Sequence, residues 1–321
     1  MKPARVIKLL PAICVCALAI SLWISRTSFN FMYPDDGYRY VIGVCQQNLQ
    51  TNAQLAFKND LEAAVARRDD INVIFYSAGG DTQRQIQQIH MLLEQRADCV
   101  IVSAENLEAI EPALEEVRNK EVSLIVLSTY KNEVVCDAII RTDYYEIGRA
   151  AGTYFMERDG EQAVCFLEIH GKPRAQSSRE LQRGFRSVYD DTGIFFSYVI
   201  VGGESYRNTQ ERIVQSNMCD VSPQITAVFA HSDEMALGAA QVFQAHEQTP
   251  RILGIGGWDG RLSGITGVSS SRIEATVAVS SGGREAFSFA EDLMLGKTVP
   301  KEYILPFTIV NTENLDDYLS Q

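Results

Sequence analysis

The stretch ITAVFAHSDEMALG, residues 225–238, decides the fold, because an apolar run ends at His231, Ser232 and Asp233 just where a helical pattern begins. This pattern predicts a buried strand followed at once by a helix, the repeating unit of an open α/β sheet. Small ligands bind such sheets outside the carboxyl ends of the strands, where a Ser or Asp either caps the helix or contacts the ligand. We expect Ser232 and Asp233 to divide these two roles. His231 has no sequence signal of a partner, and we assign it no catalytic role.

A second strand end of the same kind occurs in ILGIGGWDG, residues 252–260, where an apolar run opens into Trp258 and Asp259. An aromatic face beside a carboxylate is a common means of holding a sugar or polyol. We therefore predict that Trp258 stacks on a ligand. Asp259 suits a ligand-binding carboxylate and a helix cap equally well, and both roles can coexist. The glycines here lack the spacing of a dinucleotide-binding loop.

Composition excludes several classes of function. The 321 residues, 46% of them hydrophobic, suit a pair of α/β domains, and a net charge of −12 argues against nucleic acid, which needs a basic surface. Like-charge repulsion of this kind favours a monomer. Four histidines without paired spacing and the lack of C-x-x-C give no sign of zinc or another cofactor. The five cysteines beyond residue 32 are scattered, which favours buried thiols over a disulfide framework, above all for Cys45, Cys99 and Cys165.

An enzyme is the main alternative class. The sequence contains neither G-x-S-x-G nor H-E-x-x-H, the motifs of two large groups of hydrolases. Asp233 and Asp259 could form a glycosidase pair if their carboxylates faced each other across a cleft, but sequence does not give their separation. We expect a protein without catalytic residues.

The N-terminal segment, residues 1–32, differs from the rest of the chain. Three basic residues precede the uncharged run 9–24, and Arg26 follows it. This pattern predicts a secretory signal peptide or an uncleaved membrane anchor, and the length of the run favours the anchor. Positive charge before the run places the rest of the chain outside the membrane. We expect an extracytoplasmic protein, periplasmic or on the cell surface.

From residue 40 onward, short apolar runs alternate with amphipathic helical stretches, the pattern of a parallel sheet covered on both faces. One complete unit is predicted over residues 40–143 and a second begins at residue 144. The tail holds a further helix and strand, which we expect the two units to share. The predicted lobes are therefore residues 40–143 plus 280–304 and residues 144–279 plus 305–321.

Four segments of the sequence resemble a known family, the extracytoplasmic sugar-binding proteins of the ribose/galactose type. They are AVFAHSDEMALGA (227–239), GWDG (257–260), SSRELQRGF (177–185) and LMLGKTVP (293–300). The family shares its fold with lactose-repressor-like effector domains, but those regulators begin with a helix-turn-helix, whereas this chain begins with an apolar segment. The resemblance implies a type 1 periplasmic binding fold: two doubly wound parallel-sheet lobes with three crossovers that close on one ligand.

The same resemblance implies which positions contact the ligand. Trp258 is similar to the stacking aromatic, Asp259 to the carboxylate that binds two hydroxyls, and Ser232 stands where the family often has Asn, with Asp233 beside it. The other implied positions lie in further loops and at the first crossover: Tyr206, Ser103, Ser128, Thr129, Thr142 and Asp143.

Some residues depart from the family pattern. The loop after the first strand, which contains Gln50, has Ala53 and Gln54 where pentose binders carry two phenylalanines. Leu181 replaces an expected arginine, although Arg179 lies nearby and joins the candidate site. An arginine binds bidentately and is not freely exchanged for leucine. The sequence therefore leaves three classes of ligand: a sugar other than ribose, a modified polyol and a non-sugar metabolite.

Taken together, the residues and the resemblance predict a solute-binding protein that captures a small polar ligand, a sugar or polyol, for the permease of an ABC-type transporter. The alternative is a membrane-anchored sensor that passes the bound state to a histidine kinase, which an uncleaved anchor favours.

Overall fold

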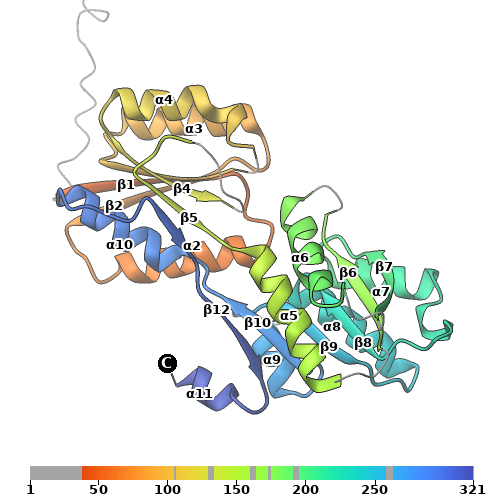
Figure 1. Cartoon of the computed structure of the whole chain (residues 1–321). Helices are drawn as coiled ribbons and strands as arrows, with labels where there is room; N and C mark the ends of the chain where they lie inside the picture. The colour runs from red at the N-terminus through yellow and green to blue at the C-terminus, as the bar shows by residue number, and fades with distance from the viewer. Residues whose placement is uncertain are drawn as a thin grey trace, which may run out of the picture. The chain divides into compact units, whose positions relative to one another are not determined.

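The computed structural model describes residues 38–104, 106–128, 134–159, 164–172, 175–190, 195–257 and 263–320 (Figure 1). The predicted signal peptide or anchor, residues 1–32, lies outside this set. Across these ranges no helix combines the length and the apolar character that a membrane crossing requires.

The first sheet has six strands, all parallel, in the order β11-β5-β4-β3-β1-β2. The strands are β1 (Tyr40–Gln46), β2 (Ile71–Ser77), β3 (Cys99–Ser103), β4 (Ser123–Ser128), β5 (Ala138–Arg141) and β11 (Glu302–Ile304). Its helical elements are α2 (Asn52–Val65), α3 (Thr82–Glu94), η1 (Glu108–Ile110), α4 (Glu111–Asn119) and α10 (Gly283–Met294). Helices α3 and α4 pack on one face and α2 and α10 on the other, each with its own buried apolar cluster (Figure 1).

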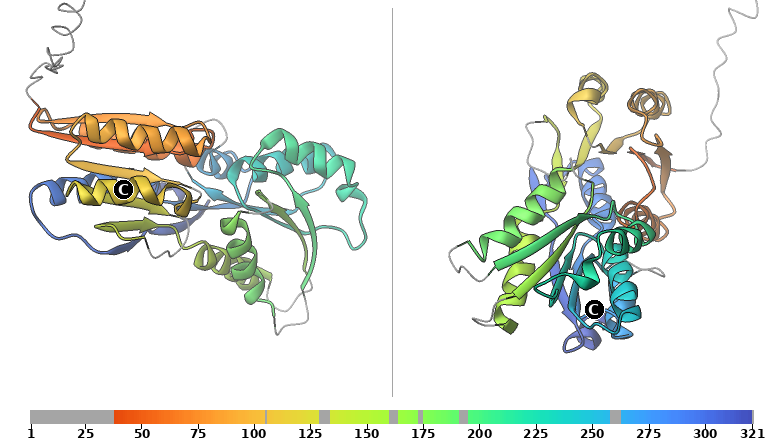
Figure 2. Two further views of the ribbon diagram at one scale, coloured as in Figure 1. Left: turned by 90° about the horizontal axis from the view of Figure 1, so that it is seen from above. Right: turned by 90° about the vertical axis from the view of Figure 1, so that its right-hand side faces the viewer.

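The second sheet also has six strands, in the order β12-β10-β9-β8-β6-β7. The strands are β6 (Val164–His170), β7 (Phe195–Val201), β8 (Ala227–Ala230), β9 (Arg251–Gly256), β10 (Ala275–Val279) and β12 (Phe307–Asn311). Its helical elements are α5 (Tyr144–Asp159), α6 (Gln176–Ser187), α7 (Tyr206–Gln215), η2 (Met218–Asp220), α8 (Asp233–Ala245), α9 (Gly264–Ser269) and α11 (Leu315–Leu319). Helices α5 and α6 cover one face, and α7 and α8 the other (Figure 2).

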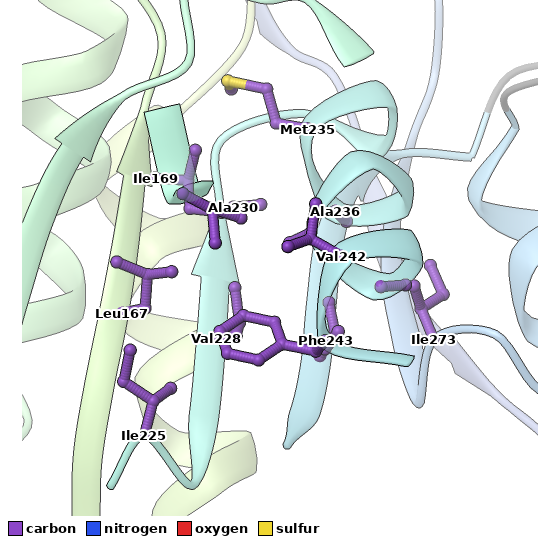
Figure 3. Close-up of a cluster of buried hydrophobic side chains, with 14 of the residues drawn as sticks. Leu167, Ile169, Ile225, Val228, Ala230, Met235, Ala236, Val242, Phe243 and Ile273 are labelled. Carbon is purple, nitrogen blue, oxygen red and sulfur yellow. The ribbon is translucent and has the colours of Figure 1, made fainter. Parts of the chain in front are cut away.

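The predicted fold class is confirmed: the chain has two doubly wound α/β lobes of the type 1 periplasmic binding fold. The strands were recognisable because, in a sheet covered on both faces, they are nearly continuous apolar runs. The core between β8 and α8 illustrates this, with Val228, Met235 and Phe243 all buried (Figure 3). The chain passes from one sheet to the other after β5, after β10 and after β11. One strand, β12, is antiparallel to its neighbour β10.

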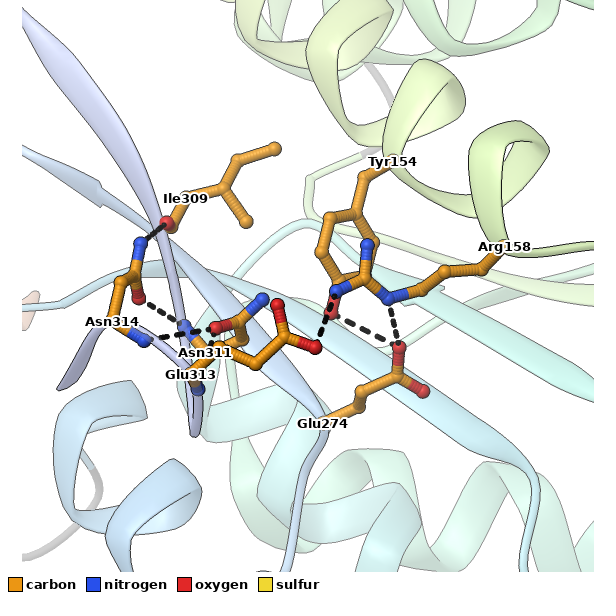
Figure 4. A network of polar contacts seen from close by, with 7 residues as sticks. All are labelled: Tyr154, Arg158, Glu274, Ile309, Asn311, Glu313 and Asn314. Atoms are coloured by element: carbon orange, nitrogen blue, oxygen red, sulfur yellow. Dashed lines mark hydrogen bonds and ion pairs between the residues drawn. The ribbon is translucent and has the colours of Figure 1, made fainter.

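A polar network joins the last strand to helix α5 (Figure 4). The Tyr154 hydroxyl donates a hydrogen bond of 3.0 Å to Glu274, and Arg158 contacts Glu274 at 3.3 Å and Glu313 at 3.7 Å. The turn after β12 is closed by Asn314, whose side chain donates to the Ile309 carbonyl. These contacts tie helix α5 to the segment before β10 and to the turn after β12.

The cysteines of the described residues are free thiols in this structure. Cys45, Cys99 and Cys165 are buried in strands. Burial raises the pKa of the Cys45 thiol to about 12 and raises that of Cys99 as well. Because the thiolate is the reactive form, these side chains act as small apolar core groups.

Helices α5 and α6 approach so closely that glycine is required at their contact. A Cβ atom added at Gly184 would lie 2.0 Å from the Tyr145 carbonyl oxygen, and one at Gly148 would lie 2.1 Å from that of Leu181. We expect Gly184→Ala to lower the free energy of unfolding by about 1–3 kcal/mol, because the helices must move apart. Urea unfolding measures this change. Gln182→Ala on the same helix is the control, and equal losses in the two variants would contradict the argument.

Candidate functional site

The sheet topology defines two places where a ligand would bind. In each sheet the chain proceeds outward in opposite directions from two adjacent central strands, β1 and β3 in the first sheet and β6 and β8 in the second. The carboxyl ends of such strand pairs form the crevice that open α/β sheets use for ligands. The polar side chains at these four strand ends are therefore the candidate site.

In the first sheet, Gln46 ends β1 and Ser103 ends β3, and the two residues are paired in the strand register. Ser128 ends the next strand, β4. The backbone here is held by Gln85, whose side-chain amide donates a 2.8 Å hydrogen bond to the Ser103 carbonyl. Gln46 is only 2% exposed, and its Oε1 has no hydrogen-bond partner within the described chain. Gln50 lies further on, exposed just before α2, where its backbone N–H donates to the Gln54 side chain.

In the second sheet, His170 ends β6 and His231 follows β8, and the two rings stack with centroids 4.5 Å apart. His170 Nε2 lies 3.3 Å from Glu168, and His231 Nδ1 lies 3.3 Å from the Ser178 hydroxyl. Burial, with His170 beside it, lowers the pKa of His231 well below its usual value, so that ring is neutral. His231 Nε2 is buried and has no hydrogen-bond partner in the described residues.

Glu168 is a fully buried carboxylate that contacts His170, one of the two stacked histidines. Arg186 on α6 donates to it from Nε at 3.0 Å and contacts it from a terminal nitrogen at 2.8 Å. Burial opposes its ionisation, but hydrogen bonds from His170 and Arg186 outweigh burial and hold the pKa of Glu168 below its usual value. The sequence analysis missed this residue, although a charged residue inside an apolar strand was a usable signal, since a buried charge needs a partner.

Ser232 and Asp233 both act on the local backbone. The Ser232 hydroxyl accepts a hydrogen bond from the Met235 N–H and caps α8, one of the two roles expected at this strand end. The Asp233 carboxylate is buried and accepts three hydrogen bonds: Gly257 N–H at 2.6 Å, Gly264 N–H at 2.8 Å and the Thr276 hydroxyl at 2.6 Å. It therefore holds both ends of the loop between β9 and α9.

Burial raises the pKa of Asp233 to about 6, against the three hydrogen bonds, which favour the charged form. The loop that Asp233 holds includes Trp258 and Asp259. Both of these residues lie outside the described residues, as does Thr129, so their place in the site stays a prediction.

The remaining candidates lie on other elements. Tyr206 begins α7 and is packed partly against the core of the second sheet. Arg179 is exposed in the first turn of α6. Asp143 caps α5 by accepting a hydrogen bond from the Glu146 N–H. Its carboxylate also lies 3.3 Å from the Arg141 guanidinium, at the first passage between the sheets.

The geometry offers hydrogen bonds rather than metal ligands. Within the described ranges, no group of three or more His, Cys, Asp or Glu side chains is arranged to hold a metal ion. The strand ends instead present an amide, hydroxyls and the neutral imidazole of His231, which suit an uncharged polar ligand.

Comparison with known proteins gives consistent results. A family model described as "Periplasmic binding protein domain" matches residues 42–298. The ribose import binding protein of Bacillus subtilis is 25% identical over 272 residues, which cover 84% of this chain and 87% of that protein.

Two solved structures share the fold. The fructose-binding periplasmic domain of a hybrid two-component system has a TM-score of 0.74 at 23% identity, covering 88% of this chain and 94% of that one. A solute-binding protein of an ABC transporter from Bacillus halodurans, solved with bound myo-inositol, has a TM-score of 0.75 at 18% identity, covering 88% and 98%. Since the family model spans most of the sequence and both sheets have the corresponding architecture, the chain belongs to the periplasmic binding protein domain family.

Proposed function

We propose that this protein binds one small polyhydroxylated molecule, a sugar or polyol, outside the cytoplasm and performs no chemistry on it. The observation that carries the proposal is the set of polar groups at the carboxyl ends of the central strands: Gln46, Ser103 and Ser128 in the first sheet, and His170, His231 and Ser232 in the second. Hydroxyl groups both donate and accept hydrogen bonds, so a polyol can satisfy this mixed set.

The ligand lies, on this proposal, between two lobes made of residues 40–143 plus 280–304 and residues 144–279 plus 305–321. The placement of β11 in the first sheet and β12 in the second supports these bounds. Trp258 stacks on the ligand and Asp259 binds its hydroxyls, with Tyr206, Asp143, Gln50, Arg179 and Thr129 around them. Asp233 contributes by holding the loop that carries Trp258 and Asp259.

A thermal-shift screen against ribose, fructose, xylitol and myo-inositol tests the proposal. A ligand that binds only the folded state adds about 2.7 kcal/mol of stability at a hundredfold excess over its dissociation constant. We expect at least one of these compounds to raise the melting temperature, and Trp258→Ala to abolish that shift while the variant stays folded. A shift retained in the variant would remove Trp258 from the site, and no shift with any polyol would overturn the function.

Two partners fit such a protein. The permease of an ABC-type transporter is supported by the ribose import binding proteins, and a histidine kinase is supported by the fructose-binding domain of a hybrid two-component system. We favour the permease and keep residues 1–32 as a signal peptide or anchor. Neighbouring genes that encode a histidine kinase and no permease would favour the sensor.

A further inference from the structure

Four buried side-chain atoms of the described chain have no hydrogen-bond partner, and two of them lie at the candidate site. They are Gln46 Oε1, at the carboxyl end of β1, and His231 Nε2, just after β8. The other two lie elsewhere: Gln248 precedes β9 at its amino end, and Glu285 lies in the first turn of α10. A buried polar atom without a partner is costly, so proteins rarely retain one without a reason.

The backbone of Gln46 and the ring of His231 are both held in place by neighbouring residues. Gln46 is paired in register with Ser103, and its own carbonyl accepts from the Ala78 N–H at 2.9 Å. His231 is stacked on His170, tilted against Phe229 at 5.3 Å, and fixed through Nδ1 by Ser178. Such preorganised groups need little reordering when a ligand arrives.

We propose that Gln46 and His231 are specificity-determining residues that each supply one hydrogen bond to a neutral, hydroxyl-bearing ligand, one from each sheet. The inference rests on the proposed function and gives each of these two residues a specific part in selecting the ligand. Gln46 Oε1 only accepts, so it excludes an anionic oxygen at that point. His231 Nε2 carries no positive charge to attract one. The pair therefore selects sugars and polyols over sugar acids and sugar phosphates.

The experiment replaces each polar group by an apolar one of similar size, Gln46→Leu and His231→Phe. Gln46→Leu loses an unpartnered buried atom, so this variant without ligand is expected to melt at the same temperature as the wild type or higher. His231→Phe loses Nε2 but also the contact of Nδ1 with Ser178, so its melting temperature is compared with that of Ser178→Ala, which loses the same contact and keeps Nε2. Affinity for the best of ribose, fructose, xylitol and myo-inositol, measured by calorimetry on the full chain, is expected to fall at least tenfold. A residue with a merely structural role would lower the melting temperature instead.

Two control variants are matched to these. Gln85→Leu removes a buried glutamine that does have a partner, the Ser103 carbonyl, and is expected to lower the melting temperature. His246→Phe alters a histidine at the far end of α8, bonded to the Val242 carbonyl, and is expected to leave affinity unchanged.

The outcomes separate the two proposals. If the wild-type protein binds a polyol and both variants bind it within about twofold of the wild type, the inference is wrong and the proposed function stands. If the wild type prefers the corresponding sugar acid or phosphate, the inference is also wrong, because Gln46 Oε1 and His231 Nε2 would then not select a neutral ligand. If the wild type binds no polyol at all, the proposed function fails and this inference fails with it.

Discussion

Arg186→Met is expected to lower the free energy of unfolding by about 3 kcal/mol. Glu168 has no exposed surface, and the guanidinium of Arg186 supplies its closest contacts, at 3.0 and 2.8 Å. Removing one partner of a buried ion pair costs about 3–5 kcal/mol, because the other charge is left buried without compensation. The lower end of the range applies, since Arg186 is 37% exposed and His170 still contacts Glu168. Urea unfolding at pH 7 measures the loss.

The control for this variant lies one turn away on the same helix. Arg183 pairs with Glu180 at 2.7 Å but is 67% exposed, so Arg183→Met is expected to cost less than about 1 kcal/mol. Equal losses in the two variants would show that burial of Glu168 is not the cause.

The pH dependence gives a second check on Glu168. Its pKa is lowered in the folded protein, so its stabilisation is present above the unfolded pKa and is lost as the pH falls through the folded pKa. The stability gap between the wild type and Arg186→Met should therefore narrow when the pH is lowered below 4.5, the ordinary value for Glu. A gap that stays constant would contradict the assignment of an ionised Glu168.

The fold was predictable from the sequence because its signals are local. Each buried parallel strand is a short apolar run, and several of the following helices begin at a capping residue such as Ser232. The antiparallel pairing of β12 (residues 307–311) with β10 was not predictable in this way. In the sequence the two strands are separated by helix α10 and by β11, which belongs to the first sheet. Strand direction depends on that distant pairing and leaves no periodic pattern in the strand itself.

The candidate site was predictable only in part, for the same reason. The polar residues after the strands marked its position, but their partners are distant in sequence. Asp233 binds Gly257, Gly264 and Thr276, which lie 24 to 43 residues away. The stacking of His170 on His231 likewise depends on the neighbouring positions of β6 and β8. A local pattern therefore identifies a polar strand end without showing whether it contacts a ligand or the protein.

Asp233→Ala is expected to weaken ligand binding by more than tenfold and to lower the free energy of unfolding by about 2–3 kcal/mol at pH 7. The change leaves the N–H groups of Gly257 and Gly264 without their acceptor, and a buried unsatisfied donor costs about 1–3 kcal/mol. It also releases both ends of the loop that carries Trp258. The fluorescence of Trp258, isolated by Trp23→Phe, is expected to respond to ligand before the change and not after it.

A matched control is Asp81→Ala, which removes an exposed aspartate that accepts hydrogen bonds from the backbone N–H groups of Gln83 and Arg84. It is expected to cost about 1 kcal/mol and to leave affinity unchanged. The pKa of Asp233 is raised to about 6 in the folded protein, whereas the ordinary value of 3.8 applies to the unfolded chain. Between these two pH values the unfolded chain has lost the proton and the folded protein still holds it. The stability that Asp233 contributes therefore falls as the pH rises from 3.8 to 6. The gap between the wild type and Asp233→Ala should therefore be wider at pH 4 than at pH 7, and a gap that widens toward pH 7 would mean that the three hydrogen bonds outweigh burial.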